Sequence, residues 1–491
     1  METFKLRMKY LFTSTKGLIL FAIAITTLVT IVWGTLSNPV AQTGIGDWVS
    51  RVLGMRLVPA EREGRIIVLY HSIAMAVIAI EVYMVTDLFK IHRIWRLIIN
   101  ITMTLGYLGT VVFGLFFAYF IWHHAFHGMY LTGLFLTFMV GLMLLVALWP
   151  WAKSARQVDP DYSRTRSGID LERTAVFATV LTALISSIFG AVPAMEIGKS
   201  FNFFLAEDVI RLPEKTLLQY SIIGHLHIML ALIAILLTLI VGRWLGFKGI
   251  LHKIAMPLMI LGTIVLNIGV WGVVTPFQPI AHTIIYVGAT PAMFAALLLL
   301  IWNWNNQIRT GTDGIAKPSF GQKLRALFRD PLKFGSSWQM LFMNLSTSGL
   351  GIFMAVKLDE IFRQWPAREE RIELTGHWHA LSAIIATIIL LYYGDILGLK
   401  GRARKIYGWG LIIFSDLALA SVTALEMKRL WISEAEQQPL VNVLNTLIDT
   451  GLGVVMLVLT VVVVYRVVDF FKKRGTWRSE VDDRLQDEIG A

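Results

Sequence analysis

The sequence contains no cysteine. This absence excludes disulfides, thiolate metal sites, iron–sulfur clusters and covalently attached c-type haem within the chain. Charged residues are also scarce, since they make up 16% of the 491 residues, where about 25% is usual for a soluble domain. The side chains left for a soft or borderline metal are 11 histidines and 19 methionines.

Hydrophobic residues are abundant and reach 56% of the chain. Such an excess over so great a length indicates a membrane protein with many spans. The 16 tryptophans are typical of the aromatic belts at membrane interfaces. The net charge of +11 does not predict nucleic-acid binding, because the basic residues lie in short runs between hydrophobic segments.

The hydrophobic stretches predict an all-α polytopic membrane protein. A helix needs about 20 apolar residues to cross the hydrocarbon core, and twelve stretches meet this requirement. We expect one transmembrane domain over 1–491, with spans at about 17–36, 66–87, 96–121, 129–151, 172–198, 216–242, 250–274, 279–303, 338–357, 374–394, 406–426 and 446–468.

The distribution of Lys and Arg predicts the orientation. Of the 44 basic residues, 31 fall on the side of the two termini and 13 on the other side. The positive-inside rule therefore predicts an integral protein of a bacterial- or archaeal-type cytoplasmic membrane with both termini in the cytoplasm. The inner loop 304–337 contains a predicted amphipathic surface helix near Lys323–Leu332, and membrane lipid is the first expected partner.

Five histidines fall at a similar depth in the outer half of three predicted spans. His71 lies near the outer end of the second span, His225 and His227 lie in the sixth, and His377 and His379 lie near the start of the tenth. Polar side chains are costly in the bilayer, so such a set is kept for a reason. Each pair is separated by two residues, which places its rings about 200° apart around a helix.

Haem is the group that best suits this set. Neutral imidazole is a common metal ligand and a frequent axial ligand of haem iron. No carboxylate or thiolate lies near the histidines, so a bare hard cation is a poorer match. The structural alternative for any one of these residues is a hydrogen bond across a helix interface.

Twelve spans, a histidine near the outer end of the second, a histidine in the sixth and His-x-His in the tenth resemble subunit I of the haem–copper oxidase superfamily. The membrane subunit of nitric oxide reductases is most similar in character. The resemblance covers the whole chain in topology, but the sequence match is confined to these helices. It implies that His71 and His379 ligate a first haem and that His377 ligates a second.

The sequence departs from this family at the second metal. The family uses one histidine of the sixth span, which His225 matches, and two adjacent histidines late in the seventh, where this sequence has Ile268 and Gly269. Met229 stands where the family has Tyr or Glu. We therefore expect no separate copper or non-haem iron site. His225 or His227 then becomes the sixth ligand of the second haem, opposite His377.

These observations predict an electron-transfer subunit with two b-type haems near the outer face. It would relay electrons between an outer-side redox protein, such as a c-type cytochrome, a cupredoxin or a peripheral oxidoreductase, and quinone or a partner complex. We expect a multi-subunit assembly and no nucleic acid. The alternatives are a terminal oxygen or nitric oxide reductase with an atypical site, and a transporter or haem-handling protein.

Several other residues have open roles at this stage. The resemblance places a basic pair, Lys428 and Arg429, against haem propionates. The acid-rich outer loop from Asp359 to Glu373 is a docking surface for a basic donor protein or a solvated loop. His123, His124 and His127 form an interfacial turn or a further site, and His282 has no assigned role.

Overall fold

The computed structural model describes residues 2–37, 44–55, 62–121, 123–196, 216–273, 275, 277–433 and 436–471. This part of the chain is helical, with one isolated β-bridge between Ser163 and Asp170. The chain divides into two compact units. Unit 1 comprises 1–147, 190–204 and 459–491, and unit 2 comprises 148–189 and 205–458. The prediction of one domain over the whole chain stays a prediction.

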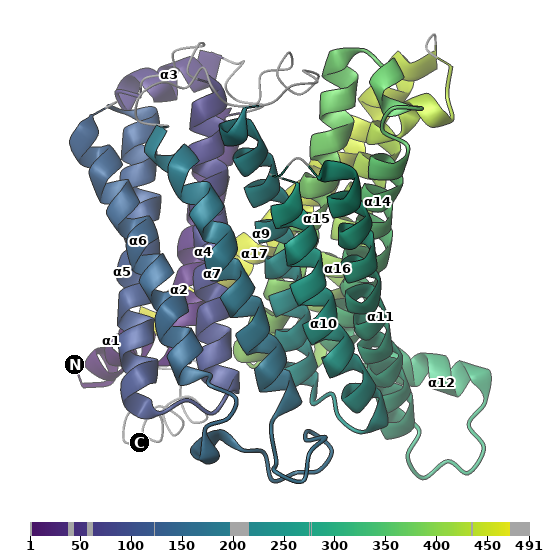
Figure 1. Ribbon diagram of the computed structural model, residues 1–491. Helices are drawn as coiled ribbons and strands as arrows, with labels where there is room; N and C mark the ends of the chain where they lie inside the picture. Colours follow the sequence, from purple (N-terminus) through teal and green to yellow (C-terminus); the bar gives the residue numbers. More distant parts are fainter. Residues whose placement is uncertain are drawn as a thin grey trace. The chain divides into compact units, whose positions relative to one another are not determined.

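Unit 1 contains the N-terminal helices and the ends of two long ones (Figure 1). Helix α2 packs on α4, α4 on α5, and α5 on α6. A chain of polar side chains ties them together: Thr86 donates to Asn100, and Asn100 donates to Thr15. The helices are α1 (Glu2–Thr13), α2 (Thr15–Ser37), α3 (Gly44–Val52), α4 (Arg62–Leu88), α5 (Arg93–Tyr119) and α6 (His124–Ala147).

Unit 2 contains the remaining helices, with α10 against α11 and α15 against α16 and α13. Helices α7 and α17 cross from one unit into the other. The helices are α7 (Leu171–Glu196), α9 (Leu217–Leu245), α10 (Ile250–Gly272), α11 (Gln278–Gly311), α12 (Phe320–Leu327), α13 (Pro331–Leu341), α14 (Ser348–Val356), α15 (Ala367–Ile396), α16 (Gly401–Glu426) and α17 (Gln437–Phe471). Short segments are η3 (Lys153–Ala155), η4 (Phe342–Thr347), η5 (Phe362–Gln364) and η6 (Lys428–Leu430).

Eleven helices of the described residues are long and apolar enough to cross a membrane. The number is twelve if α1 and α2, which meet at a bend of 83°, count as one span. The prediction of an all-helical membrane protein is confirmed at this level. Most predicted spans coincide with a helix to within a few residues, whereas α11 and α17 extend well beyond the predicted 279–303 and 446–468.

The ninth predicted span begins earlier than expected and is not one regular helix. It runs from α13 through η4, a π-helical segment, into α14. Its first half is polar, and these side chains have partners within unit 2. Trp338 and Gln339 donate to the two carboxylate oxygens of Asp416 at 2.8 and 2.6 Å, and Asn344 donates to Thr238 at 3.3 Å.

The two helices that carry the histidine pairs of unit 2 have clear start signals. Helix α9 begins with a capping box between Thr216 and Gln219 and ends at Gly246, whose φ of 75° suits glycine. Helix α15 begins after Pro366. Its first turn contains Glu369 and Glu370, and carboxylates at this end of a helix interact favourably with the helix dipole. Both helices are continuous through their histidines, so the expected 200° separation applies.

Candidate functional site

The best-defined feature near the histidines is the meeting of α9 and α15. The ring of His227 lies edge to face against Trp378, with centroids 4.8 Å apart and an angle of 88° between the planes. Trp378 stands between His377 and His379 in sequence, so those two rings point to either side of the contact. His227 is therefore the sixth-span histidine on the α15 side, and its Nδ1 lies 2.8 Å from the Ile223 carbonyl of its own helix.

His225 points to a different neighbour. Its Nδ1 lies 3.2 Å from the Ser186 carbonyl of α7. The Ser186 hydroxyl donates to Asn267 and accepts a hydrogen bond from the Trp271 indole, at 3.1 and 3.0 Å. Asn267 and Trp271 belong to α10, the span that has no metal-ligating pair. This network was not predicted, although its polar residues were visible in the sequence.

His377 is half-buried and faces the glycine-rich helix α14. Its Nε2 lies 3.5 Å from the point where a Cβ would stand on Gly351. Gly351 therefore contributes backbone but no side chain next to this ring. On the other side of α15, His379 is exposed.

Gly376, next to His377, packs against the side chain of Glu426, a buried carboxylate at the end of α16. A Cβ at this position would require the Glu426 side chain to move. This contact favours the interpretation of Gly376 as a packing glycine. His282 of α11 is exposed and close enough to His227 for an electrostatic interaction.

In unit 1, His71 is half-buried and its ring lies edge to face with Tyr130 at 6.4 Å. His71 belongs to unit 1 and His379 to unit 2, so their pairing on one haem stays a prediction. Tyr130 also stacks with His127, whose Nε2 lies 3.0 Å from the Ala194 carbonyl. His123 accepts a hydrogen bond from the Ala125 amide. These contacts favour the interpretation of this turn as structural.

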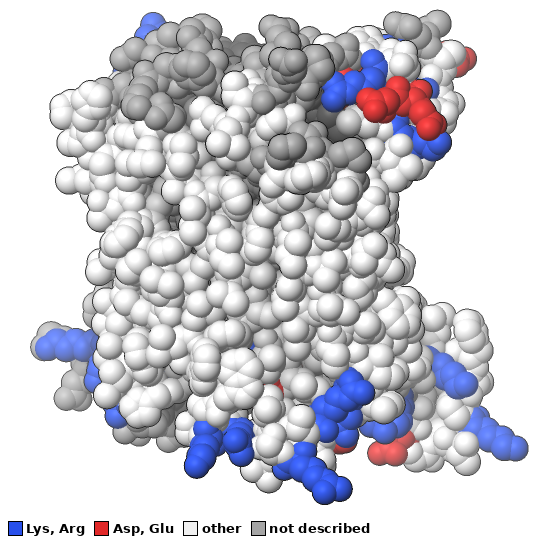
Figure 2. Space-filling view, viewed as in Figure 1, with Lys and Arg blue, Asp and Glu red and all other residues white. Residues whose placement is uncertain are grey.

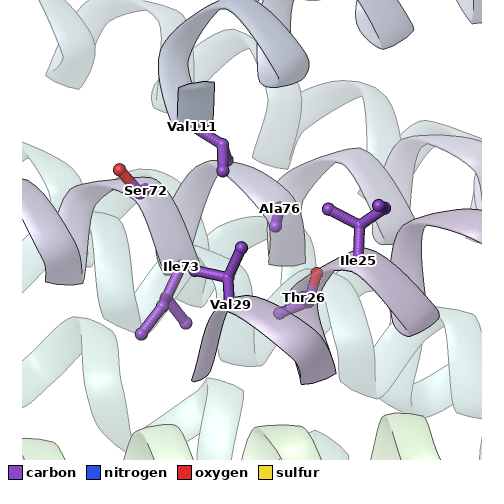
Figure 3. A pocket seen from close by; sticks show the side chains of 7 residues that line it. All are labelled: Ile25, Thr26, Val29, Ser72, Ile73, Ala76 and Val111. Carbon is purple, nitrogen blue, oxygen red and sulfur yellow. The ribbon is translucent and has the colours of Figure 1, made fainter. Parts of the chain in front are cut away.

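A small hollow of unit 1 lies close to His71 in sequence, between α2, α4 and α5 (Figure 3). Its two hydroxyls are occupied, since Thr26 donates to Ala22 and Ser72 to Val68. The hollow is too narrow to admit a water molecule, so it is not a ligand site. Its lining residues are Ile25, Thr26, Val29, Ser72, Ile73, Ala76 and Val111.

The basic pair after α16 has a carboxylate partner in the chain. Arg429 donates to Glu369 from two nitrogens, with the Nη2–Oε1 distance at 2.9 Å, and Lys428 lies 4.0 Å from the same carboxylate. The guanidinium of Arg429 lowers the pKa of Glu369 below its ordinary value. The predicted contact of Lys428 and Arg429 with propionates stays a prediction.

The same ion pairs neutralise much of the acid-rich loop. Glu369 pairs with Arg429, and Arg363 lies 3.6 Å from Glu370 and 3.7 Å from Asp359. Glu360 pairs with Lys357. The four carboxylates of this loop whose contacts are described are therefore each close to a cation, which favours the solvated-loop interpretation.

A polar cluster that the sequence did not suggest lies in unit 2 where α7 begins and α9 ends. Glu172 is fully buried and accepts a hydrogen bond from Arg243 at 3.1 Å. Asp170 lies 3.6 Å from Arg243, whose guanidinium stands 5.1 Å from the centroid of the Tyr162 ring. Because the charges compensate one another, Arg243 is the residue that makes burial of Glu172 tolerable.

Among the described residues, no three His, Cys, Asp or Glu side chains gather closely enough to hold a bare metal ion. A haem iron differs from a bare ion because it needs only one or two protein ligands. Contacts of Nδ1 with backbone carbonyls, as at His225 and His227, orient an imidazole so that Nε2 is the ligating atom. No protein-family model, curated protein or solved structure matches this chain.

Proposed function

We propose that the chain is a membrane electron-transfer subunit that holds two b-type haems in a haem–copper-oxidase-like bundle. It would relay electrons between an outer-side redox protein and quinone or a partner complex. The observation that carries the proposal is the contact of His227 with Trp378, which has His377 and His379 on its two flanks. Helices α9 and α15 thus carry three imidazoles, those of His227, His377 and His379, that point in different directions.

Exposure of the histidines supports a bound group. His227 and His379 are exposed although they belong to apolar, membrane-spanning helices. Polar side chains are costly on the surface of a membrane-spanning helix. In a haem site, such a ring would ligate the iron, and the apolar porphyrin would cover the ring.

We assign His227, rather than His225, as the partner of His377 on the second haem. His227 lies on the side of α9 that meets α15, whereas His225 contacts α7. Gly351 lies next to the His377 ring and contributes backbone but no side chain there. The first haem is assigned to His71 and His379 on the family resemblance alone.

Haem iron, when bound, supplies a carrier for one electron. The residues next to His225 favour an electron carrier over a reductase of oxygen or nitric oxide. Such a reductase needs a second metal near this histidine, and α10 provides Asn267 and Trp271, which is a poor donor set for copper or iron. If His227 and His377 both held the iron, no position would remain for a gas.

Absorbance and electron paramagnetic resonance spectroscopy of the purified protein test the proposal. We expect two haems per chain, two low-spin ferric signals and no change of the reduced spectrum with carbon monoxide. A high-spin signal, or a carbon monoxide adduct, would establish an open iron site and favour the reductase. Absence of stoichiometric haem would overturn both and leave a transporter or haem-handling protein.

Single substitutions test the assignment of ligands. His71→Ala should remove one low-spin signal and His377→Ala the other, each with loss of about one haem per chain. His252→Ala is the matched control, because this buried histidine of α10 lies outside the proposed ligand set. Loss of the same signal in His71→Ala and His377→Ala would show that the pairing is wrong.

A further inference from the structure

The short helix α12 lies between two membrane-spanning helices and has a face that unit 2 does not cover. Helix α11 ends at Gly311 and α13 begins at Pro331, and both belong to predicted spans. The chain outside these spans is short, so α12 cannot lie far from the membrane boundary. Figure 1 shows α12 beside the end of α11, pointing away from the other helices of unit 2. A helix is present near the predicted Lys323–Leu332, but it begins and ends earlier, at Phe320 and Leu327. Pro331 already belongs to α13.

Helix α12 packs on α11 through one side. Ala326 is buried, and its Cβ lies 2.6 Å from the point where a Cβ would stand on Gly311. Phe320 and Leu324 are 80% and 39% exposed. These two residues are one turn apart on the same face, and that face lies roughly opposite Ala326 at about 100° per residue. The side of α12 opposite Ala326 therefore carries two exposed apolar side chains, Phe320 and Leu324, which form its apolar face.

The apolar face is bordered by cations. Lys317, Lys323, Arg325 and Arg329 are all exposed, and none forms an ion pair with another residue of the described chain. Asp330, which follows Arg329 in sequence, is held by Arg404 at 2.9 and 3.0 Å. Figure 2 shows Lys and Arg side chains over the region of α12. A helix with an apolar face between exposed cations matches the boundary between acyl chains and phosphate groups.

We propose that α12 is an interfacial anchor that binds anionic phospholipid. Phe320 and Leu324 lie among the upper acyl chains, and Lys317, Lys323, Arg325 and Arg329 contact lipid phosphates. The position between two spans fixes the depth of α12, and its charge selects anionic headgroups. This proposal does not depend on haem, since no histidine takes part in it.

The absence of cysteine makes the depth of α12 measurable in the full chain. Leu324→Cys and Phe320→Cys each introduce one site for a spin label on the apolar face. Gln322→Cys is the matched control, because residue 322 lies about 200° from residue 324 on the same helix. The labelled proteins are placed in vesicles of phosphatidylcholine, and in vesicles of equal parts phosphatidylcholine and phosphatidylglycerol.

We expect labels at 320 and 324 to collide with oxygen, which enters the bilayer, more often than with a water-soluble nickel chelate. The label at 322 should show the reverse. The difference in reagent access between the labels at 320 and 324 and the label at 322 should be larger in vesicles with phosphatidylglycerol. It should become smaller when Lys323, Arg325 and Arg329 are changed to Glu. Equal access of both reagents to 322 and 324 would place α12 in water and overturn the proposal. Protection of 324 from both reagents would show that protein covers this face, and would overturn it as well.

Discussion

His227 and Trp378 join α9 to α15 by an edge-to-face contact of their rings, with centroids 4.8 Å apart. This contact turns His227 toward the helix that carries His377 and His379, and turns His225 toward α7. The two histidines of α9 therefore have different neighbours although they are two residues apart.

Substitution of each histidine of α9 should give a different result. His227→Gln should remove the low-spin signal of the second haem and leave that of the first, because glutamine is a poor axial ligand. His225→Gln should retain both signals. Electron paramagnetic resonance and the haem-to-protein ratio measure the difference, and the opposite pattern would make His225 the ligand.

The space beside His377 should depend on Gly351. Gly351→Leu places a branched side chain next to the imidazole, so we expect loss of the second haem with the first retained. Gly351→Ala should be tolerated, because its Cβ would make an ordinary contact at 3.5 Å. Gly349→Leu is the matched control on the same helix, since no atom lies within 4 Å of its Cβ position. Equal haem content in the two leucine variants would contradict this assignment.

Removal of Arg243 should destabilise unit 2. Arg243→Met leaves Glu172 buried without its cation, and removal of one partner of a buried pair costs about 3–5 kcal/mol. The double variant Arg243→Met/Glu172→Gln should recover a large part of the loss. Unfolding by heat or denaturant in detergent measures both.

Lys357→Met is the control for this experiment, because it breaks the exposed pair with Glu360. Exposed ion pairs contribute roughly 0–1 kcal/mol, so this change should be small. If the double variant were as unstable as Arg243→Met, the charge of Glu172 would not be the cause of the destabilisation.

The link between Glu369 and Arg429 predicts a pH dependence. Arg429 and Lys428 lower the pKa of Glu369 from its ordinary value near 4.5. A carboxylate with a lowered pKa stabilises the fold above its ordinary value, and this contribution is lost as the pH falls through the folded-state pKa. Glu369→Gln should therefore lower the unfolding temperature at neutral pH and make no difference in more acidic solution.

Glu360→Gln is the matched control for Glu369→Gln, because Glu360 is an exposed residue of the same acid-rich loop. The unfolding temperature of both variants is compared with the unchanged chain from neutral pH to below pH 4. A difference for Glu369→Gln that persists at the lowest pH would exclude its charge as the cause.

Hydropathy predicted the spans because apolar length is a property of the local sequence. It missed the start of the ninth span, where Ser336, Ser337 and Gln339 interrupt the apolar pattern. Their burial is possible because unit 2 supplies partners such as Asp416. Contacts between residues far apart in sequence cannot be read from a local pattern.

The histidine pairs show the same limit at the site. Their spacing predicted that the two rings of each pair point in opposite directions. Which ring of His225 and His227 points toward α15 depends on the rotation of the whole helix, which packing decides. Trp378 stands between the histidines of α15 and was visible in the sequence, but nothing local indicated that His227 would contact it.

The number of residues in the π-helical segment η4 determines which face of α14 points toward His377. A π turn contains about one residue more than an α turn, and one residue corresponds to about 100° of rotation. If one residue between 342 and 347 were removed, an α-helix through this segment would bring a different residue from Gly351 to His377. The surroundings of His377 thus depend on the length of η4.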